Sequence, residues 1–403
     1  MKRFAVLVLL MLSAVPLPGR GFAADWEGIY QGTLGKAKVI VQLVEPLDDM
    51  EGETKRETSR YSYVPKVRDL NPVLTKKGKT LAFDETPQQF YEFNGEGAEK
   101  VITGKWTITA DGKTAKGTWA SPDGKKKLPI ALTRVPDLPE EEADPALNIW
   151  SDTYNDLWLK SVTFSDAGLA KSFGPIEVRW LKDSAYGITY PVLGAFPDAA
   201  RKEAANALLM KAIRKSLGDY RDCKNGVPLD WEPENAVEMS FEINYASPTL
   251  LSFTESGSVF CGGAHPSNYA TPSTYDLTAP ARIGGTENLD LSPEGFGRIL
   301  KLANTDERIA FEKFALGLWK AGADADKEMG PDCATGWIED APDGAKNFSL
   351  FFTDKGLAVF RTDYPHVASV CLGTDFNPTI IPWTELRPWL QDGQTLLTTE
   401  LKP

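Results

Sequence analysis

The stretch VFCGGAHPSNY, residues 259–269, combines residue types that catalytic and metal sites use. His265 is one of only two histidines in the chain, and several serines flank it. A hydrolytic triad needs a nucleophile, a base and an orienting acid, yet the sequence lacks the G-x-S-x-G elbow that exposes such a serine. Neither His265 nor His366 has the spacing of zinc ligands. We therefore expect no Ser–His triad, no metal and no cofactor.

Backbone geometry offers another interpretation of the same stretch. Gly262 and Gly263 permit a tight turn that a Cβ would block, and the imidazole of His265 could hold the loop by hydrogen bonds to carbonyl groups. A pair of carboxylates for glycoside hydrolysis stays open, because the fold sets its spacing and 56 acidic residues are present.

The four cysteines are Cys223, Cys261, Cys333 and Cys371. An even number without a C-x-x-C pair favours disulfides in an exported protein. Three pairings are possible, and we favour Cys223–Cys261 with Cys333–Cys371. Pairing of Cys261 with Cys371 stays an alternative.

Residues 1–24 have the pattern of a secretory signal: Lys2 and Arg3, an apolar run, and small residues before a cleavage site. That run is shorter than the ~20 residues of a membrane span, so we expect a periplasmic or secreted protein without one. Loss of the signal removes three basic residues and no acid, which changes the formal charge from −12 to −15. An acidic protein is a poor partner for nucleic acid and a suitable one for a basic protein.

The length of the mature chain exceeds that of one typical domain and predicts two, and the composition indicates the boundary. Residues 137–147 are acidic and rich in proline, which is typical of a linker. Residues 25–136 form the first predicted domain, an all-β antiparallel small barrel or curled sheet. Residues 148–403 form the second, an α+β domain with a mainly antiparallel sheet.

The first domain shows strand and turn signals. Asp111-Gly112 and Asp123-Gly124 separate alternating segments, which predicts a meander of strands at about 102–110, 113–121 and 126–134. Three further strands are predicted at 26–33, 39–45 and 81–86, with a polar excursion at 46–72. Trp106 and Trp119 are expected in the core.

The second domain mixes both kinds of element. The spacing predicts helices over 198–220, 292–303 and 306–322, the first with Asp198 as N-cap and with one face formed by Leu209, Ala212, Ile213, Ser216 and Leu217. Paired strands are predicted at 174–183 and 185–193, two more at 237–260 around Ser247-Pro248, and a hairpin at 347–360. A strand and a short helical turn are predicted at 378–390.

Four motifs in this order resemble a known exported domain. They are the GGAH loop at 262–265, TDKGL at 353–357, a loop with Tyr364, and IPWTEL at 381–386. The set resembles a domain of unknown function that forms the extracellular part of the lysozyme-sensing anti-sigma factor RsiV and accompanies some peptidoglycan deacetylases. Pro266 departs from the pattern, since a small residue is expected there.

The resemblance implies a non-enzymatic binding module of the cell envelope, with a basic lysozyme-like protein or peptidoglycan as partner. An anti-sigma role is not expected, because the sequence shows no transmembrane helix. The alternative is a cell-wall hydrolase or deacetylase with unidentified carboxylates. A cleft with converging acids or with His265 at its floor would favour the enzyme, and a flat apolar patch the binder. The predicted binding residues are Gly262, Gly263, His265, Tyr269, Tyr364, His366 and Trp383.

Overall fold

The computed structural model describes residues 26–45, 59–87, 101–136, 153–225, 237–261, 267–285, 292, 294–302, 304–325, 348–361 and 378–397. The predicted signal and linker lie outside these ranges.

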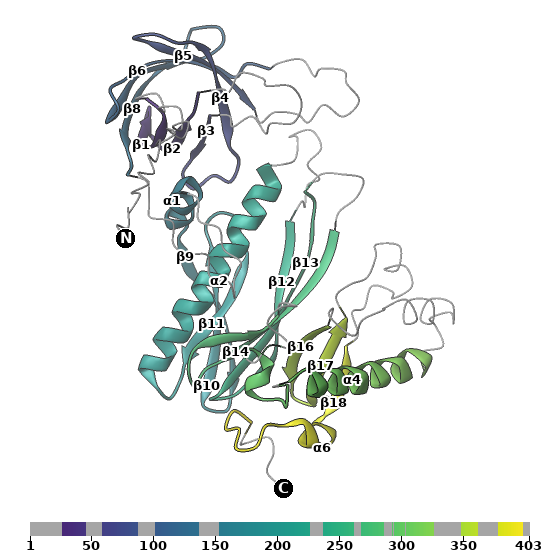
Figure 1. The fold of residues 1–403 in the computed structure, drawn as a ribbon. Coiled ribbons are helices and arrows are strands. Elements are labelled where there is room, and N and C mark those ends of the chain that lie inside the picture. The colour runs from purple at the N-terminus through teal and green to yellow at the C-terminus, as the bar shows by residue number, and fades with distance from the viewer. Residues whose placement is uncertain are drawn as a thin grey trace, which may run out of the picture.

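Eight antiparallel strands near the N-terminus close into a barrel (Figure 1). The strands are β1 (Gly28–Leu34), β2 (Ala37–Leu43), β3 (Arg60–Tyr63), β4 (Leu70–Lys76), β5 (Leu81–Pro87), β6 (Gly104–Ala110), β7 (Thr114–Ala120) and β8 (Lys127–Arg134). The pairing of β1 with β8, from Tyr30 opposite Arg134 to Leu34 opposite Ile130, closes the ring. The predicted all-β antiparallel barrel is confirmed.

The polar excursion predicted for 46–72 is wrong where β3 and the start of β4 lie. Tyr61 and Ser62 in β3 are fully buried, although the strand has only four residues. Such a short strand has no readable alternation, and its pairing with β2 supplies the hydrogen bonds that define it.

The turns between β6, β7 and β8 form as predicted. Gly112 has φ +79° and Gly124 has φ +70°, the left-handed values that these Asp-Gly turns need. The register then places Trp106 directly opposite Trp119. Trp106 is fully buried, Trp119 is half-buried, and both pack in the barrel core, as expected.

A buried carboxylate lies in the barrel between these tryptophans. Oε2 of Glu85 accepts hydrogen bonds from Nε1 of Trp106 at 3.0 Å, from Nε1 of Trp119 at 2.7 Å and from the hydroxyl of Tyr61 at 2.6 Å. The hydroxyl of Thr103 donates to Oε1 at 2.9 Å. These four donors compensate the cost of burying the carboxylate.

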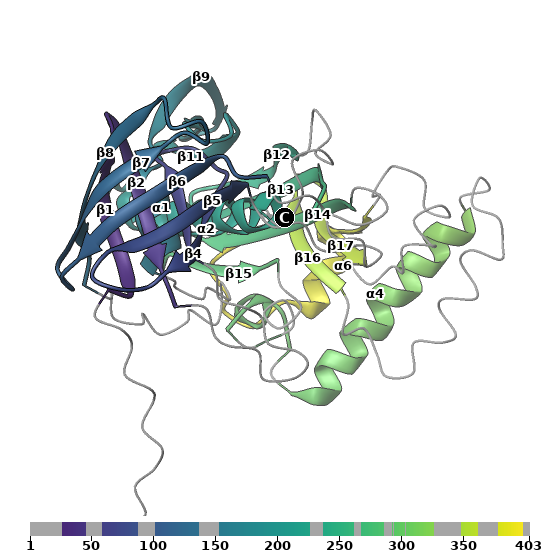
Figure 2. The ribbon, with the colours of Figure 1, turned by 90° about the horizontal axis from the view of Figure 1, so that it is seen from above.

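Helices and three further antiparallel sheets follow the barrel (Figures 1 and 2). The helices are α1 (Thr153–Ser161), α2 (Ala199–Asn225), α4 (Thr305–Ala325) and α6 (Trp383–Leu386). The sheets are β11-β10-β9, β12-β13-β14-β15 and β16-β17-β18. Their strands are β9 (Phe164–Phe173), β10 (Ile176–Asp183), β11 (Thr189–Ala195), β12 (Val237–Ala246), β13 (Leu250–Val259), β14 (Ser267–Asp276), β15 (Ala281–Gly284), β16 (Phe348–Thr353), β17 (Gly356–Arg361) and β18 (Thr379–Pro382).

The predicted helix over 198–220 is confirmed as α2 and extends to Asn225. Oδ1 of Asp198 accepts a hydrogen bond from the backbone N–H of Arg201 at 3.0 Å, as an N-cap does. The helix predicted over 292–303 is wrong: its described residues hold only a short 3₁₀ turn, Phe296–Arg298. Gly295 and Gly297 lower the helix propensity there, although Oγ of Ser292 does cap the N–H of Gly295 at 2.9 Å.

The barrel shares a hydrophobic core with the helices below it. Ile29 and Ile40 on its outer face pack in one cluster with Tyr154 and Trp158 of α1 and with α2 and β11. Figure 1 shows α1 directly below the barrel and α2 running from there along the sheets. The predicted domain boundaries are thus crossed by packed side chains.

Candidate functional site

A cavity of about 460 Å³ lies between α2 and the β12–β15 sheet. On the helix, Leu209, Ala212, Ile213 and Ser216 line it, which are four of the five residues of the predicted face. On the sheet the lining residues alternate, with Phe253 and Glu255 from β13 and Tyr269, Thr271, Ser273 and Tyr275 from β14. Period-3.6 and period-2 faces therefore meet to form one cleft.

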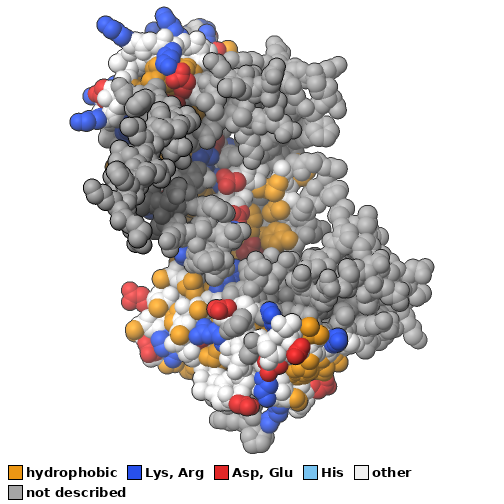
Figure 3. Space-filling view, viewed as in Figure 1, with side chains coloured by type: hydrophobic (Ala, Val, Ile, Leu, Met, Phe, Trp, Pro, Cys, Tyr) orange, Lys and Arg blue, Asp and Glu red, His pale blue; other side chains and the backbone are white. Residues whose placement is uncertain are grey.

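The space-filling view shows the surroundings of this cleft. Hydrophobic and acidic side chains lie side by side in the hollow below the barrel, over β12 and β13 (Figure 3). The described residues thus form a hollow that contains both hydrophobic and acidic side chains. This shape differs from the flat apolar patch that we expected for a binding protein.

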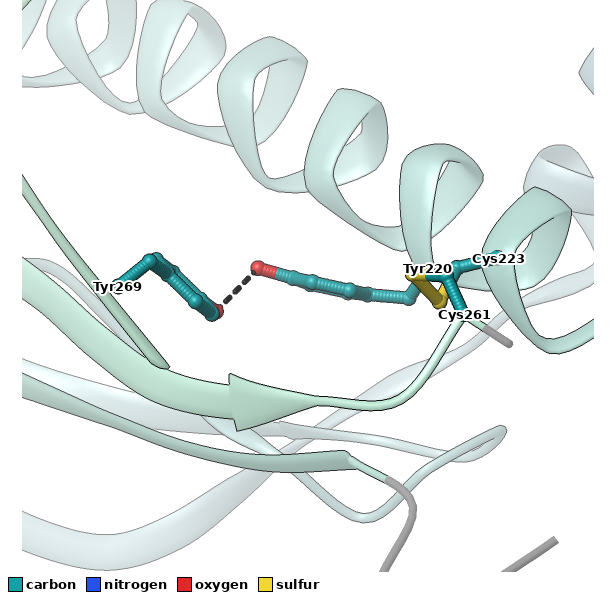
Figure 4. Close-up of a disulfide and its surroundings, with 4 residues drawn as sticks. All are labelled: Tyr220, Cys223, Cys261 and Tyr269. Carbon is teal, nitrogen blue, oxygen red and sulfur yellow. Dashed lines mark hydrogen bonds between the residues drawn. A yellow bond between two sulfur atoms is a disulfide. The ribbon is translucent and has the colours of Figure 1, made fainter. Parts of the chain in front are cut away.

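A carboxylate and two tyrosines form the polar centre of the cavity. The hydroxyl of Tyr220 donates a short hydrogen bond to Oε1 of Glu255, and the hydroxyl of Tyr269 donates to the same oxygen at 3.1 Å. The two tyrosine oxygens lie 2.7 Å apart (Figure 4). From the residues that the structure describes, Oε2 of Glu255 receives only a long hydrogen bond, 3.4 Å, donated by the hydroxyl of Ser216.

Burial dominates the titration of this cluster. It raises the pKa of Glu255, and the hydrogen bonds from Tyr220, Tyr269 and Ser216 and the charge of Arg282 offset only part of that rise. Burial together with the nearby Glu255 also raises the pKa of both tyrosines. The tyrosines therefore stay neutral, and Glu255 favours its neutral form more than an ordinary glutamate does.

Arg282 places a positive charge on the wall of the same cavity. Its Nη2 donates to Oγ of Ser273 at 2.9 Å and to the carbonyl oxygen of Gly285 at 3.0 Å, while Nε donates to the carbonyl oxygen of Gly284 at 3.0 Å. These contacts fix the guanidinium, and Nη1 makes no hydrogen bond to any residue that the structure describes.

A disulfide joins the end of α2 to the end of β13 beside the cavity. Cys223, three residues after Tyr220, is bonded to Cys261, as predicted (Figure 4). This bond rules out the alternative pairing of Cys261 with Cys371. Cys333 and Cys371 lie outside the described residues, so their pairing stays a prediction.

Two of the predicted binding residues are described, and they lie apart. Tyr269 lines the cavity. Trp383 belongs to another core: its ring stacks on Phe352 with centroids 5.7 Å apart, and its Nε1 donates to the carbonyl oxygen of Asp354 at 3.0 Å. Trp383 is thus placed for packing and does not line the cleft. The other five, Gly262, Gly263, His265, Tyr364 and His366, lie outside the described residues.

Tyr220, Glu255 and Arg282 lie at the site but were not among the predicted site residues. The helical face that contains Ile213 and Ser216 continues to Tyr220, so helical spacing could have found that residue. Glu255 follows Leu251 and Phe253 at strand spacing, which marks an acid on an apolar face. No comparable signal points to Arg282.

The described residues hold no group of three histidine, cysteine or acidic side chains arranged for a metal ion. None of the described helices has the length and apolar character needed to cross a membrane.

Comparison with known proteins finds a distant structural similarity. No family model matches the chain, and no curated protein matches it. Among solved structures it is similar to a member of the DUF3298 family from Bacteroides fragilis, with 12% identity and a TM-score of 0.31. The match covers 57% of this chain and 94% of that one.

Proposed function

We propose that this chain is an exported, non-enzymatic binding protein of the cell envelope, and that the cleft between α2 and the β12–β15 sheet receives its ligand. One observation carries this proposal: an aromatic and apolar cavity with a few convergent polar groups, Glu255, Tyr220 and Tyr269, at its centre. Sites for small ligands have this composition, and most have volumes of roughly 300–1,000 Å³.

The acids of the cleft favour binding over glycoside hydrolysis. Hydrolysis uses two carboxyl groups that flank the scissile bond. Among the described residues, the acids that line the cavity are Glu255 and Asp219. Asp219 is largely exposed and forms an ion pair with Lys215 one turn earlier on α2, and Oε1 of Glu255 is occupied by the two tyrosines. A cell-wall hydrolase or deacetylase stays the alternative.

The size of the cavity favours a peptidoglycan fragment as the ligand. About 460 Å³ holds a short peptide or a disaccharide, whereas a folded protein buries ~800 Å² of each partner at a standard interface. A basic lysozyme-like protein is the second candidate, because the formal charge of the chain, −12 with the signal and −15 without it, would attract one.

The proposal is tested by calorimetric titration of the mature protein with soluble peptidoglycan fragments. Ala212 lines the cavity, and Ala204 is exposed on the same helix. We expect Ala212→Trp to fill the cleft and abolish binding, and Ala204→Trp to leave it unchanged. Equal binding by both variants would place the site elsewhere.

The same protein samples test the two other candidates, binding of a basic protein and hydrolysis of the cell wall. Titration with a basic lysozyme is repeated near physiological ionic strength, where the Debye length is ~8 Å. Binding that survives this salt would favour the protein partner, and heat that vanishes would reflect net charge alone. Mass spectrometry of the fragments after incubation reports turnover, and new products lost in Ala212→Trp would favour the hydrolase.

A further inference from the structure

The cluster at the centre of the cleft is short of hydrogens when Glu255 is ionised. Oε1 of Glu255 and the two hydroxyl oxygens of Tyr220 and Tyr269 lie within hydrogen-bond distance of one another, which makes three contacts. Each short contact between oxygens needs one hydrogen, and two tyrosines supply two. With Oε1 protonated the third hydrogen is present, and the contact with Tyr220 reverses: Glu255 then donates to Tyr220, Tyr220 to Tyr269, and Tyr269 to Glu255.

A neutral Glu255 changes the charge of the cavity. Lys215 and Asp219 form an ion pair at its edge and cancel one another. Arg282 then remains as the uncompensated charge among the described residues that line the cavity. Its guanidinium is fixed by Ser273, Gly284 and Gly285, so an anion that binds there meets a group already held in place.

From this arrangement we propose that the cleft binds the free carboxylate end of a short peptide, with Arg282 as the partner of the carboxylate. The inference rests on the proposed function, for which it names the recognised chemical group. The last amide N–H of the peptide donates to Oε2 of Glu255, which among the described residues accepts only the long hydrogen bond from Ser216. Small apolar side chains of the peptide pack on the aromatic wall formed by Phe253 and Tyr275.

A ligand with a cationic head group is the competing possibility. It would need Glu255 ionised, which leaves one of the three contacts between oxygens without a hydrogen, and it would approach Arg282. Both effects oppose a cation, so the geometry favours the anion.

The arrangement makes binding depend on pH with a definite sign. As pH rises through the raised pKa of Glu255, its carboxyl ionises and cancels the positive charge that attracts the ligand. Binding is therefore strongest on the acidic side. The charged or titratable groups near Glu255 are Tyr190, Lys215, Asp219, Tyr220, Tyr269, Tyr275 and Arg282. Burial raises the pKa of these four tyrosines, so they stay neutral over the same range.

The test uses N-acetyl-D-alanyl-D-alanine and the same dipeptide with a C-terminal amide, each titrated into the mature protein. We expect the acid to bind at least roughly tenfold more tightly than the amide, the value of one charge-assisted hydrogen bond. Arg282→Gln should remove this preference. Arg179→Gln, a change in an exposed arginine of β10, is the matched control.

The variant Glu255→Gln distinguishes a ligand with an anionic head group from one with a cationic head group. The glutamine amide is neutral at every pH, and its NH₂ group can donate to the oxygens of Tyr220 and Tyr269 in place of Oε1. We expect this variant to keep the preference for the acid and to bind equally across a pH series, while the unmodified protein binds more weakly as pH rises through the raised pKa of Glu255. Glu238→Gln, an exposed change on β12, should retain the pH dependence.

The outcomes distinguish this inference from the proposed function. If Glu255→Gln lost binding and Arg282→Gln bound more tightly, the proposed recognition of a ligand carboxylate would be wrong. That result would support a cationic ligand. Equal binding of acid and amide, with wall fragments still bound in the cleft, would overturn the inference and leave the binding function intact. Failure of the dipeptides, wall fragments and lysozyme alike would overturn both.

Discussion

Arg221 of α2 and Asp69, just before β4, form a buried ion pair that joins the helix to the barrel. Neither side chain exceeds 6% exposure. The hydroxyl of Tyr154 donates to Oδ1 of Asp69 at 2.8 Å, and Oδ1 of Asn225 accepts the backbone N–H of Asp69 at 2.9 Å. Two helices therefore contact the barrel through one carboxylate.

The same end of α2 also determines the shape of the cleft. Tyr220 contacts Glu255, Arg221 contacts the barrel, and Cys223 is bonded to the end of β13. Three anchors within four residues give the helix end little freedom. We infer that the barrel stabilises the position of Tyr220 in the cleft.

Removal of one partner of the buried pair should strongly destabilise the protein. Arg221→Met leaves the carboxylate of Asp69 buried and without its charge partner, and we expect a loss of about 3–5 kcal/mol in the free energy of unfolding. Urea unfolding followed by tryptophan fluorescence measures it. Arg179→Met, at a half-exposed ion pair, should barely change the midpoint. A similar small change in Arg221→Met would contradict the role of the pair.

Loss of the disulfide should also destabilise the fold. Cys223 and Cys261 are separated by 38 residues, and closing a loop of that length is worth about 4 kcal/mol in the chain-entropy model. The double variant Cys223→Ser/Cys261→Ser avoids mispaired thiols and should unfold at lower urea than the oxidised protein. Equal midpoints would show that packing alone holds the end of α2 against β13.

Local patterns were sufficient to predict much of the fold. Asp-Gly turns located β6, β7 and β8, and helical spacing located α2 and its buried face. These signals depend on neighbours within a few residues, which the sequence shows directly. The oxidising compartment expected for an exported chain predicted disulfides, and the favoured pairing Cys223–Cys261 is confirmed.

The remaining features of the fold and of the cleft depend on pairing between strands, which local sequence patterns do not reveal. The segment SNYATPSTYD has few apolar residues, yet it forms β14 because it pairs with β13 over ten positions, from Leu250 opposite Asp276 to Val259 opposite Ser267. That register brings Tyr269 to Glu255, and the pairing of β15 with β14 brings Arg282 to the same cavity. A contact that depends on the registers of two strand pairs has no local signature.

The stability of the protein should fall with pH because of Glu255. In the unfolded chain this carboxyl ionises near its ordinary value of 4.5, whereas burial raises its pKa in the folded protein. Above 4.5 the unfolded state therefore gains from ionisation before the folded state does, and the free energy of unfolding falls until the pH exceeds the raised pKa.

Glu255→Gln should remove this contribution. We expect the variant to gain stability relative to the unmodified protein as pH rises, measured as the difference in urea midpoints across a pH series. Glu238→Gln, which changes an exposed acid on β12, should follow the unmodified protein. A difference between Glu255→Gln and the unmodified protein that does not vary with pH would show that Glu255 titrates normally.

Gly104→Ala should displace Trp119 from Glu85 inside the barrel. A Cβ at position 104 would lie 2.2 Å from Nε1 of Trp119, closer than any real contact, so the indole must move. The hydrogen bond from that nitrogen to Glu85 is then lost, at a cost of about 1.5–3 kcal/mol for a bond to a charged group. The emission of Trp119 should shift to longer wavelength as its ring becomes more exposed.

The matched control is Gly317→Ala on an exposed turn of α4, where nothing lies within 4 Å of an added Cβ. Alanine has the higher helix propensity, so this change should stabilise the protein by up to about 1 kcal/mol. If Gly104→Ala lowers the free energy of unfolding and Gly317→Ala raises it, the close approach of Trp119 to the backbone of β6 requires glycine at position 104. A neutral Gly104→Ala would instead mean that the indole reaches Glu85 without that space.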